Sequence, residues 1–396
     1  MIDLDKHRLL KYPLFSTLYF SQGIVYALAT VIINVYLDSK GVPDSTIALI
    51  IGIAYIPWVI KFIFGGIVDR YIKFGRRNFI ILGGTISAFS FIVLSFIDPG
   101  VALIPFTLFL LLGASGIAFL DVSADAWAIQ TTDVHERGKV NGTMFAGLFF
   151  GMATTSIVFG HVAENYGYNV TFFTAGLIVL AIILFPILFK EKIIIEKKQK
   201  IGKKLVKEFK KKNTQLITLL FPVSAISFGL LAILIPQYLN DVLHLTIGQI
   251  GIISALGPIA TVVGNLVGGF MADRWGRKKS LYIFLGINLI FASLLIFADN
   301  WLMLAIIWGI IGFLHGGHYS TLGALAMDVT NPKLGATEFS LIMAAGNAGE
   351  MGGTIFSGSL ISLIGFSRTF LYSGWVYGPA LLILYYMKLK YKNKDT

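Results

Sequence analysis

The chain contains twelve apolar stretches of roughly 20 residues, the length that an α-helix needs to cross the hydrocarbon core of a bilayer. Of its 396 residues, 56% are hydrophobic and only 13% are charged, a balance far from that of a soluble domain. We therefore expect an all-α membrane protein with twelve transmembrane helices. The stretches lie at approximately 14–37, 46–68, 78–97, 101–130, 140–162, 170–189, 214–239, 247–271, 280–298, 301–327, 338–363 and 369–388.

The basic residues indicate which side of the membrane each loop faces, because cytoplasmic loops are enriched in Lys and Arg. If the N-terminus is cytoplasmic, Lys40 and Arg368 are the only two of the 32 Lys and Arg residues that fall in outer loops. Both termini are therefore predicted to be cytoplasmic, in a multi-pass protein of the cell or inner membrane. The net charge of +11 arises largely in short inner loops, which argues against binding to nucleic acid.

One long polar segment, residues 190–212 with eleven lysines, divides the chain into two halves. We expect a six-helix bundle over residues 1–189, a basic cytoplasmic linker over 190–213 and a second six-helix bundle over 214–396. The linker is typical of a solvated or amphipathic segment on an anionic leaflet surface. The chain has no cysteine, so disulfides and thiolate sites are excluded. No apolar core precedes Pro13, so no cleavable signal peptide is expected.

A charged loop recurs after the second and the eighth apolar stretches, at matching places in the two halves. Its glycines allow helices to approach closely, its aspartates can cap a neighbouring helix, and its arginines can bridge to helix C-termini or carboxylates. The loop resembles the signature loop of the major facilitator superfamily, which acts there as a conformational latch. Its residues are Gly65, Asp69, Arg70, Gly75, Arg76 and Arg77 in the first half and Gly269, Asp273, Arg274, Gly276, Arg277 and Lys278 in the second.

The resemblance to this superfamily covers nearly the whole chain. It implies two pseudo-symmetric six-helix bundles around a cavity lined by the first, fourth, seventh and tenth helices. Aligning Gly138 with Gly335 superposes the fourth and tenth helices and makes Asp121 correspond to His318. Parallel repeats of this kind suit alternating access by rocking of the two halves.

A narrower resemblance is strongest in the first half. Residues 19–23, 61–62, 69–71, 121–127 and 136–138 occur in the order seen in the AmpG muropeptide permease and the related acetyl-CoA transporter group. In the second half, residues 327–328 and 336–339 also fit this group. The resemblance implies a permease but does not fix its substrate.

Two aspartates, Asp121 and Asp125, lie four residues apart in the fourth stretch and therefore on one face of a helix. A carboxylate at bilayer depth costs at least ~2.5 to 3.5 kcal/mol on insertion scales, so it normally faces a cavity or a partner. Lys61 lies at a similar depth in the second stretch, and we expect it to pair with one of the two. The other is then the candidate proton carrier of a symporter. A purely structural carboxylate pair and a Lys61 that snorkels alone are the alternatives.

Further polar residues inside the apolar stretches are candidates for the transport pathway. His315 and His318 favour a hydrogen-bonding or titrating role over a metal site, because no third ligand is evident, and simple packing is the alternative. Glu350 can hold a proton, contact the solute or bond across the halves. The weaker candidates are Gln22, Asn34, Gln237, Asn240, Tyr19, Tyr26 and Trp127 for solute contact, and Glu136 with Arg137 for an inner charge cluster near the latch.

Two pairs of glycines four residues apart occur in the fifth and eighth stretches, namely Gly147 with Gly151 and Gly264 with Gly268. This spacing permits close packing of helices. By the same resemblance, these two helices are expected to meet across the two halves and to act as a sliding gate.

Together these features predict a secondary active transporter that moves a small organic solute by alternating access, with proton symport as the expected coupling. An uncoupled facilitator and a proton-antiport exporter are alternatives, and a non-transporting membrane receptor or scaffold is an alternative of another class. We expect no enzyme activity, cofactor or metal, because no nucleophile with a base and no metal-ligand set is evident. The protein is expected to act as a monomer in the lipid bilayer.

Overall fold

The computed structural model describes residues 2–4, 7–132, 136–193, 202–330 and 335–387, and the described part is almost entirely helical. In chain order its elements are β1 (Ile2–Asp3), the 3-10 helix η1 (Arg8–Leu10), α1 (Lys11–Ala27), the π-helix η2 (Leu28–Ile33), α2 (Asn34–Ser39), α3 (Asp44–Val59), α4 (Lys61–Arg70), the 3-10 helix η3 (Ile72–Phe74), α5 (Arg76–Leu94), α6 (Leu103–Thr131), α7 (Arg137–Leu184), the 3-10 helix η4 (Phe185–Leu188), β2 (Phe189–Lys190), α8 (Gly202–Phe209), α9 (Lys212–Asp241), α10 (Ile247–Trp275), α11 (Arg277–Leu294), the 3-10 helix η5 (Leu295–Phe297), α12 (Trp301–Val329), α13 (Gly335–Trp375) and α14 (Tyr377–Tyr386).

Ten continuous helical stretches of the described chain are long and apolar enough to cross a membrane. Two of them turn back on themselves, α7 at Gly167 and α13 at Gly365, where φ is 84° and 77°. Glycine adopts this backbone conformation without the steric penalty that a side chain brings. Counting the segments on the two sides of each break gives twelve spans within the described residues. The all-α membrane fold is therefore confirmed, and the helices extend a few residues beyond most of the predicted boundaries.

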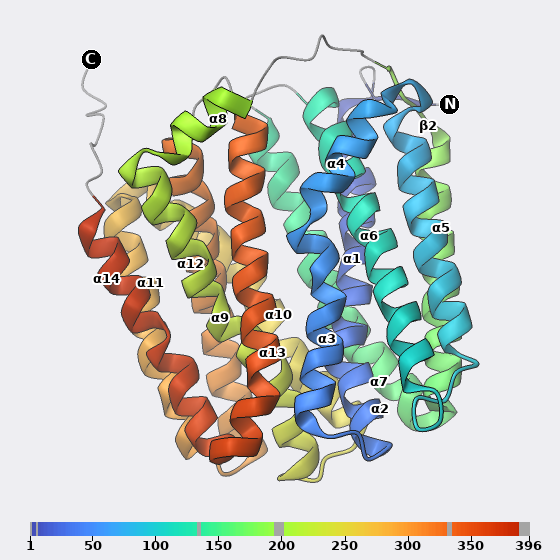
Figure 1. Cartoon of the computed structure of the whole chain (residues 1–396), viewed down its shortest axis with the longest axis vertical. Helices are drawn as coiled ribbons and strands as arrows, with labels where there is room; N and C mark the ends of the chain where they lie inside the picture. Colours follow the sequence, from blue (N-terminus) through green and yellow to red (C-terminus); the bar gives the residue numbers. More distant parts are fainter. Residues whose placement is uncertain (1, 5–6, 133–135, 194–201, 331–334, 388–396) are drawn as a thin grey trace.

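The helices form two groups, one from each half of the sequence (Figure 1). Within the first group α1 packs on α7 and α5 on α6, and within the second α9 packs on α13 and α10 on α12. The groups meet where α3 contacts α13 and α7 contacts α10. The paired strands β1 and β2, the end of α14 and α8 lie at one end of the molecule, which we name the terminal end, and the loop between α2 and α3 lies at the opposite, distal end (Figure 1).

The first two predicted helices are not uniform. The first widens into the π-helix η2 between α1 and α2, a local irregularity that is frequent at functional sites. The second is divided at Ile60 into α3 and α4, three residues after Pro57, which lacks the N–H that a helix interior requires. A further feature that the sequence did not predict is a short parallel pairing of β1 with β2, which ties the N-terminus to the end of the sixth span.

The glycine pairs do not act between the halves as predicted. A Cβ on Gly147 would lie 2.2 Å from the Ser16 carbonyl oxygen of α1, and a Cβ on Gly264 would lie 1.9 Å from the Phe313 carbonyl oxygen of α12. Both pairs therefore pack helices within their own half, since Gly151 and Gly268 face α1 and α12 as well. The contact of α7 with α10 across the halves uses Gly251 instead, where a Cβ would lie 2.0 Å from the carbonyl oxygen of Ser156.

Part of the basic linker is described. Residues 190–193 continue from β2, residues 194–201 lie outside the described part, and α8 follows before α9 begins at Lys212. Glu208 of α8 is 6% exposed and forms an ion pair with Lys211. The other lysines of this segment whose exposure is described are all exposed, as expected for a solvated linker; they are Lys190, Lys192, Lys207, Lys210 and Lys212.

Candidate functional site

A central cavity lies between the two halves and has an empty volume of about 840 Å³. Its walls come from the predicted first, fourth, seventh and tenth spans and also from α3, α4, α7 and α13. Aromatic rings predominate, accompanied by one lysine, two carboxylates and two amides, a composition that suits an organic solute with both apolar and polar faces. The lining residues are Tyr19, Gln22, Tyr26, Tyr55, Trp58, Lys61, Asp121, Phe145, Leu148, Phe149, Met152, Phe228, His315, Tyr319, Met343, Asn347 and Glu350.

An ion pair lies in the wall from the first half. Lys61 Nζ is 3.3 Å from Asp121 Oδ2, and Gln22 Nε2 donates a hydrogen bond of 2.7 Å to Asp121 Oδ1. The side chains of Lys61 and Asp121 are only 17% and 4% exposed, so each charge depends on the other for neutralisation. The structure therefore brings Lys61 together with Asp121, one of its two expected partners.

The break in the second span places Lys61 for this contact. Residue Ile60 has φ −96° and ψ 12°, outside the helical region, and Lys61 is the first residue of α4. A continuous helix would fix the direction of Lys61 relative to α3, whereas the break lets α4 take its own direction against α6. The sequence signal for this break was Pro57.

Asp125 and Trp127 do not line the cavity. Asp125, one turn beyond Asp121 on α6, accepts a hydrogen bond from the Tyr19 hydroxyl. Trp127 is fully buried and packs edge-on against Phe15, with ring centroids 5.9 Å apart. The Trp127 ring thus contributes to packing inside the first half in this conformation.

Glu350 of the second half is held by residues of the first half. Its Oε1 accepts hydrogen bonds from the hydroxyls of Tyr26 on α1 and Tyr55 on α3, the latter at 3.5 Å. Nearby, Asn347 Nδ2 donates to the Trp58 carbonyl oxygen at 3.3 Å. Among the described residues, the hydrogen-bond donors to Glu350 are hydroxyls, whereas Asp121 is paired with the Lys61 cation. The carboxyl group connects α13 to both α1 and α3.

Of the two histidines of α12, His315 lines the central cavity, whereas His318 lies outside it and does not take the predicted place in the cavity wall. The His315 ring stacks on Phe228 with centroids 4.0 Å apart. His318 Nδ1 lies 3.2 Å from the Leu314 carbonyl oxygen, and its ring meets that of Tyr377 edge-on. Both also line a smaller adjoining cavity of about 370 Å³. Among the described residues neither histidine belongs to a group of three side chains able to hold a metal.

The latch loop of the first half is organised by Glu191. The backbone N–H groups of Arg76 and Arg77, the first residues of α5, donate to its two carboxylate oxygens at 2.7 and 2.9 Å. Gly75 has φ 84°, and a Cβ there would lie 2.7 Å from Glu191 Oε2. The cap of this helix is therefore Glu191 rather than Asp69, whose side chain is exposed.

The arginines of this loop bridge to neighbouring elements. Arg77 Nη1 donates to the Phe189 carbonyl oxygen at 2.9 Å, at the end of the sixth span, and Arg76 bonds to Gln130 of α6. Arg70 lies over the Tyr71 ring at 5.7 Å. Gly65 faces Val122 of α6, where a Cβ would be in ordinary van der Waals contact at 3.4 Å. The loop thus joins α4, α5 and α6 with the end of the sixth span.

In the latch loop of the second half, Arg277 bridges two carboxylates, Asp273 at 2.5 Å and Asp328 at 3.1 Å. Lys278 Nζ donates to the carbonyl oxygens of Tyr385 and Met387 at 3.1 and 2.8 Å, at the C-terminal end of α14. Basic residues therefore bridge to carboxylates and to a helix C-terminus, which are the two contacts that the sequence predicted.

The other members of this loop have separate roles. Gly276 has φ 86° and precedes α11, in the same way as Gly75 precedes α5. Gly269 faces open space. Arg274 lies over the Phe270 ring at 5.9 Å.

The predicted inner charge cluster is described only in part. Glu136 is partly buried and immediately precedes α7. Arg137 is the first residue of α7, and its side chain lies outside the described residues. The proximity of this pair to the latch stays a prediction.

The sequence did not point to several residues of the site. Tyr55 and Trp58 lie three residues apart in the second span, and Asn347 lies three residues before Glu350, a spacing that places each pair on one face of its helix. Tyr319 directly follows His318. Glu191 was assigned to the basic linker, although it is the first acidic residue after the sixth apolar stretch.

Two similar helical bundles that span the membrane with a polar cavity between them are the architecture of a membrane transport protein for small solutes. The chain belongs to the major facilitator superfamily, whose sequence profile matches residues 15–223 and 217–396. Because the relatives below are transporters, the protein is a transporter and not an enzyme.

Relatives and solved structures agree with this assignment. The transporter AmpG 4 of Rickettsia conorii is 29% identical over 94% of this chain and 96% of its own. The anhydromuropeptide permease of Escherichia coli is 26% identical over 92% of this chain and 77% of its own. A bacterial homologue of the human lysosomal transporter Spinster superposes with a TM-score of 0.76 at 14% identity, covering 97% of both chains. The xylose transporter XylE of E. coli superposes with a TM-score of 0.74 at 12% identity over 97% of this chain and 99% of its own. The resemblance to the AmpG group is thus confirmed.

Proposed function

We propose that the protein is a proton-coupled symporter that works by alternating access, with Glu350 as the site of proton exchange. The observation that carries the proposal is that Glu350, on one half, accepts hydrogen bonds from Tyr26 and Tyr55 of the other half inside the central cavity. An ionised carboxylate without a cation is costly at this depth, and binding a proton removes that cost. Proton transfer at Glu350 would therefore change the contact between the halves.

Polar contacts between the halves at the distal end support a conformation closed on that side. Asn34 Nδ2 donates to the Ile233 carbonyl oxygen at 3.2 Å, and Glu164 Oε2 accepts from the Gly248 N–H at 3.0 Å at the start of α10. We name these contacts, with those of Asp38 and Asp44 described below, the distal gate. The positions of Lys and Arg support placing the terminal end in the cytoplasm, so the conformation would be inward-facing.

The charged wall of the first half is the proposed solute site. The Lys61–Asp121 pair offers both a cation and a carboxylate to a polar solute, and Gln22 adds an amide. Tyr26, Tyr55 and Trp58 lie beside them and provide flat aromatic faces against which an apolar face of a solute can pack. Because a permease of anhydromuropeptides is among the relatives, an amino-sugar peptide of this class is the proposed substrate.

The experiment that tests the proposal is uptake by purified protein in liposomes. With an inward-directed proton gradient, labelled anhydromuropeptide should accumulate above its external concentration, and a protonophore should abolish the accumulation. Uptake to equilibrium without a response to the gradient would instead indicate an uncoupled facilitator, and efflux driven by the gradient an antiporter. Binding without any flux would indicate a receptor.

Two carboxylate variants locate the proton. Glu350→Gln should abolish accumulation while retaining exchange of solute across the membrane, whereas Asp125→Asn should retain accumulation because Asp125 does not line the cavity. The reverse pattern would transfer the role to Asp125. We further propose that the transporter acts as a monomer without cofactor or nucleic acid, which mass measurement of the protein in nanodiscs checks.

A further inference from the structure

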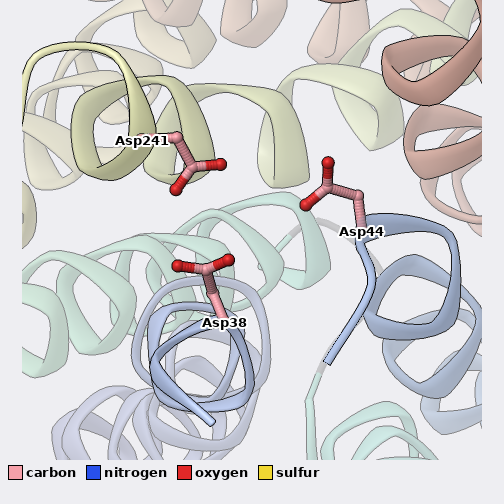
Figure 2. A group of neighbouring side chains, drawn as sticks. All are labelled: Asp38, Asp44 and Asp241. Atoms are coloured by element: carbon pink, nitrogen blue, oxygen red, sulfur yellow. The ribbon is translucent and has the colours of Figure 1, made fainter. Parts of the chain in front are cut away.

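Three aspartates converge at the distal end of the molecule, outside the central cavity (Figure 2). Asp38 lies on α2, Asp44 is the first residue of α3, and Asp241 is the last residue of α9. One carboxylate oxygen from each lies within 4.8 Å of the others. Since Asp241 belongs to the second half, the three aspartates, which we name the distal triad, span the interface between the halves.

The triad gathers negative charge without a matching cation. In the described part of the chain the ion pairs include none that involves these aspartates, and the neighbouring Lys40 is paired with Asp98 at 2.8 Å. Two of the aspartates accept hydrogen bonds from one neutral amide, because Asn240 Nδ2 donates to Asp38 Oδ2 at 2.6 Å and to Asp241 Oδ1 at 2.8 Å. Three carboxylates this close repel one another unless a cation or protons offset their charge.

A buried amide beside the triad adds a second, independent observation. Gln237 is only 1% exposed, and its Nε2 donates to Asp44 Oδ1 at 3.3 Å. Its Oε1 is buried without a hydrogen-bond partner, an uncommon state for a buried polar atom. Rotation of the terminal amide by half a turn, about a broad and soft torsion, would turn this oxygen toward the triad. In that position, Gln237 Oε1 could coordinate a cation held by the three carboxylates.

We propose that Asp38, Asp44, Asp241 and the Gln237 amide oxygen form a binding site for a hard divalent cation of the Ca²⁺ type. Carboxylate and amide oxygens are the ligands that Ca²⁺ takes, and oxygens that all lie within 4.8 Å of one another are close enough to share one Ca²⁺ at a Ca²⁺–O distance of ~2.4 Å. Mg²⁺ requires shorter and more regular coordination and therefore binds less tightly here. The three aspartates are each partly exposed, which leaves room for water to complete the coordination.

The site would act as a clamp on the distal gate. Asp44 is held against the second half by Gly358 of α13, where a Cβ would lie 2.2 Å from the Asp44 carbonyl oxygen. Opening of the gate separates α2 and α3 from α9 and so disperses the ligands. A cation that binds only the assembled ligands favours the closed conformation. This role is independent of the identity of the transported solute and of its coupling to protons.

The test uses the purified full-length protein in nanodiscs and CaCl₂ as the probe. Calorimetric titration should detect one bound Ca²⁺ per chain in the millimolar range or tighter, and CaCl₂ should raise the melting temperature. NaCl at the same ionic strength should not, and MgCl₂ should act more weakly. Asp241→Asn should weaken Ca²⁺ binding at least tenfold and abolish the shift in melting temperature. Without Ca²⁺ it should melt no lower than the unaltered protein, because it relieves repulsion.

A matched control removes one carboxylate at the same end. Asp299 is exposed next to Ala298, whose carbonyl oxygen bonds Tyr238 of α9, so Asp299→Asn should leave Ca²⁺ binding unchanged. Asp38→Asn serves as a second triad variant and should behave as Asp241→Asn does. The proposal is overturned if the unaltered protein binds no Ca²⁺, if NaCl reproduces the shift, or if the triad variants bind Ca²⁺ as well as Asp299→Asn.

The clamp on the distal gate is tested by a separate distance measurement. The chain has no native cysteine, so spin labels on Ser39→Cys and Val242→Cys, both exposed beside the triad, report the separation of α2 from α9. CaCl₂ should shift the distance distribution toward its shortest population, and Asp241→Asn should remove the response. A distribution that ignores Ca²⁺ while Ca²⁺ binds would contradict the clamp.

Discussion

Removal of Lys61 should destabilise the protein strongly, and removal of Asp121 together with Lys61 should restore most of the loss. At 3.3 Å and an effective dielectric constant of ~20, the attraction between the two charges amounts to about 5 kcal/mol, although desolvation offsets much of it. Lys61→Met leaves a carboxylate that is 4% exposed with only the Gln22 hydrogen bond, so we expect a loss of about 3 kcal/mol. The double variant Lys61→Met/Asp121→Asn leaves no buried charge and should lie within about 1 kcal/mol of the unaltered protein.

Equilibrium unfolding in SDS, followed by circular dichroism, measures this cycle of four proteins. The expected coupling energy between the two positions is about 2 kcal/mol or more. Additive losses in the double variant would refute the reasoning, because they would show that neither side chain depends on the other. Additive losses would also show that the solute site does not contain the proposed Lys61–Asp121 ion pair.

Three further results are expected. Glu191→Ala should lower the unfolding free energy by about 1 to 2 kcal/mol, because it removes the acceptor of the first two amides of α5, and the SDS unfolding curve measures the loss. Gly251→Ala should force α7 and α10 apart and widen the distal gate in spin-label distances, whereas Gly286→Ala, which meets open space, should not. The hydrogen bond from Lys40 lowers the pKa of Asp98. The stabilising effect of this bond is therefore present at neutral pH and is lost as the pH falls through the lowered pKa. Lys40→Met should raise the Asp98 pKa and change the pH dependence of the melting temperature only under acidic conditions.

The sequence predicted the architecture well because a bilayer imposes a length and an apolar composition on every span. The turns at Gly167 and Gly365 fall in the predicted gaps between apolar stretches. Basic and neutral loops alternate along the chain because successive loops face opposite sides of the membrane. The division at Ile60 was harder to predict, because proline is tolerated inside transmembrane helices and does not by itself end one.

The site was predictable where a charge interrupts an apolar stretch. Lys61, Asp121 and Glu350 each stand out at bilayer depth, and all three line the cavity. Their hydrogen-bond partners were harder to predict, because a tyrosine such as Tyr55 looks the same in the sequence whether its ring only packs or its hydroxyl donates a hydrogen bond. The glycine faces were misassigned for a related reason, since the spacing of Gly147 and Gly151 indicates close packing but not which helix approaches.

The distal triad shows a further limit of the sequence. Asp38 and Asp44 flank one outer loop, and Asp241 lies almost 200 residues later at the end of α9. Each aspartate alone is an ordinary residue at a helix end. Only the packing of the two halves brings their oxygens within 4.8 Å of one another.

In the proposed mechanism, a proton taken up at Glu350 drives solute movement between two conformations of the halves. The most direct test compares Glu350→Gln with Asp299→Asn, an exposed carboxylate variant, in proteoliposomes with an inward-directed proton gradient. We expect Asp299→Asn to accumulate labelled anhydromuropeptide as the unaltered protein does, and Glu350→Gln to exchange it without accumulation. Accumulation by Glu350→Gln at the level of the unaltered protein would contradict the claim.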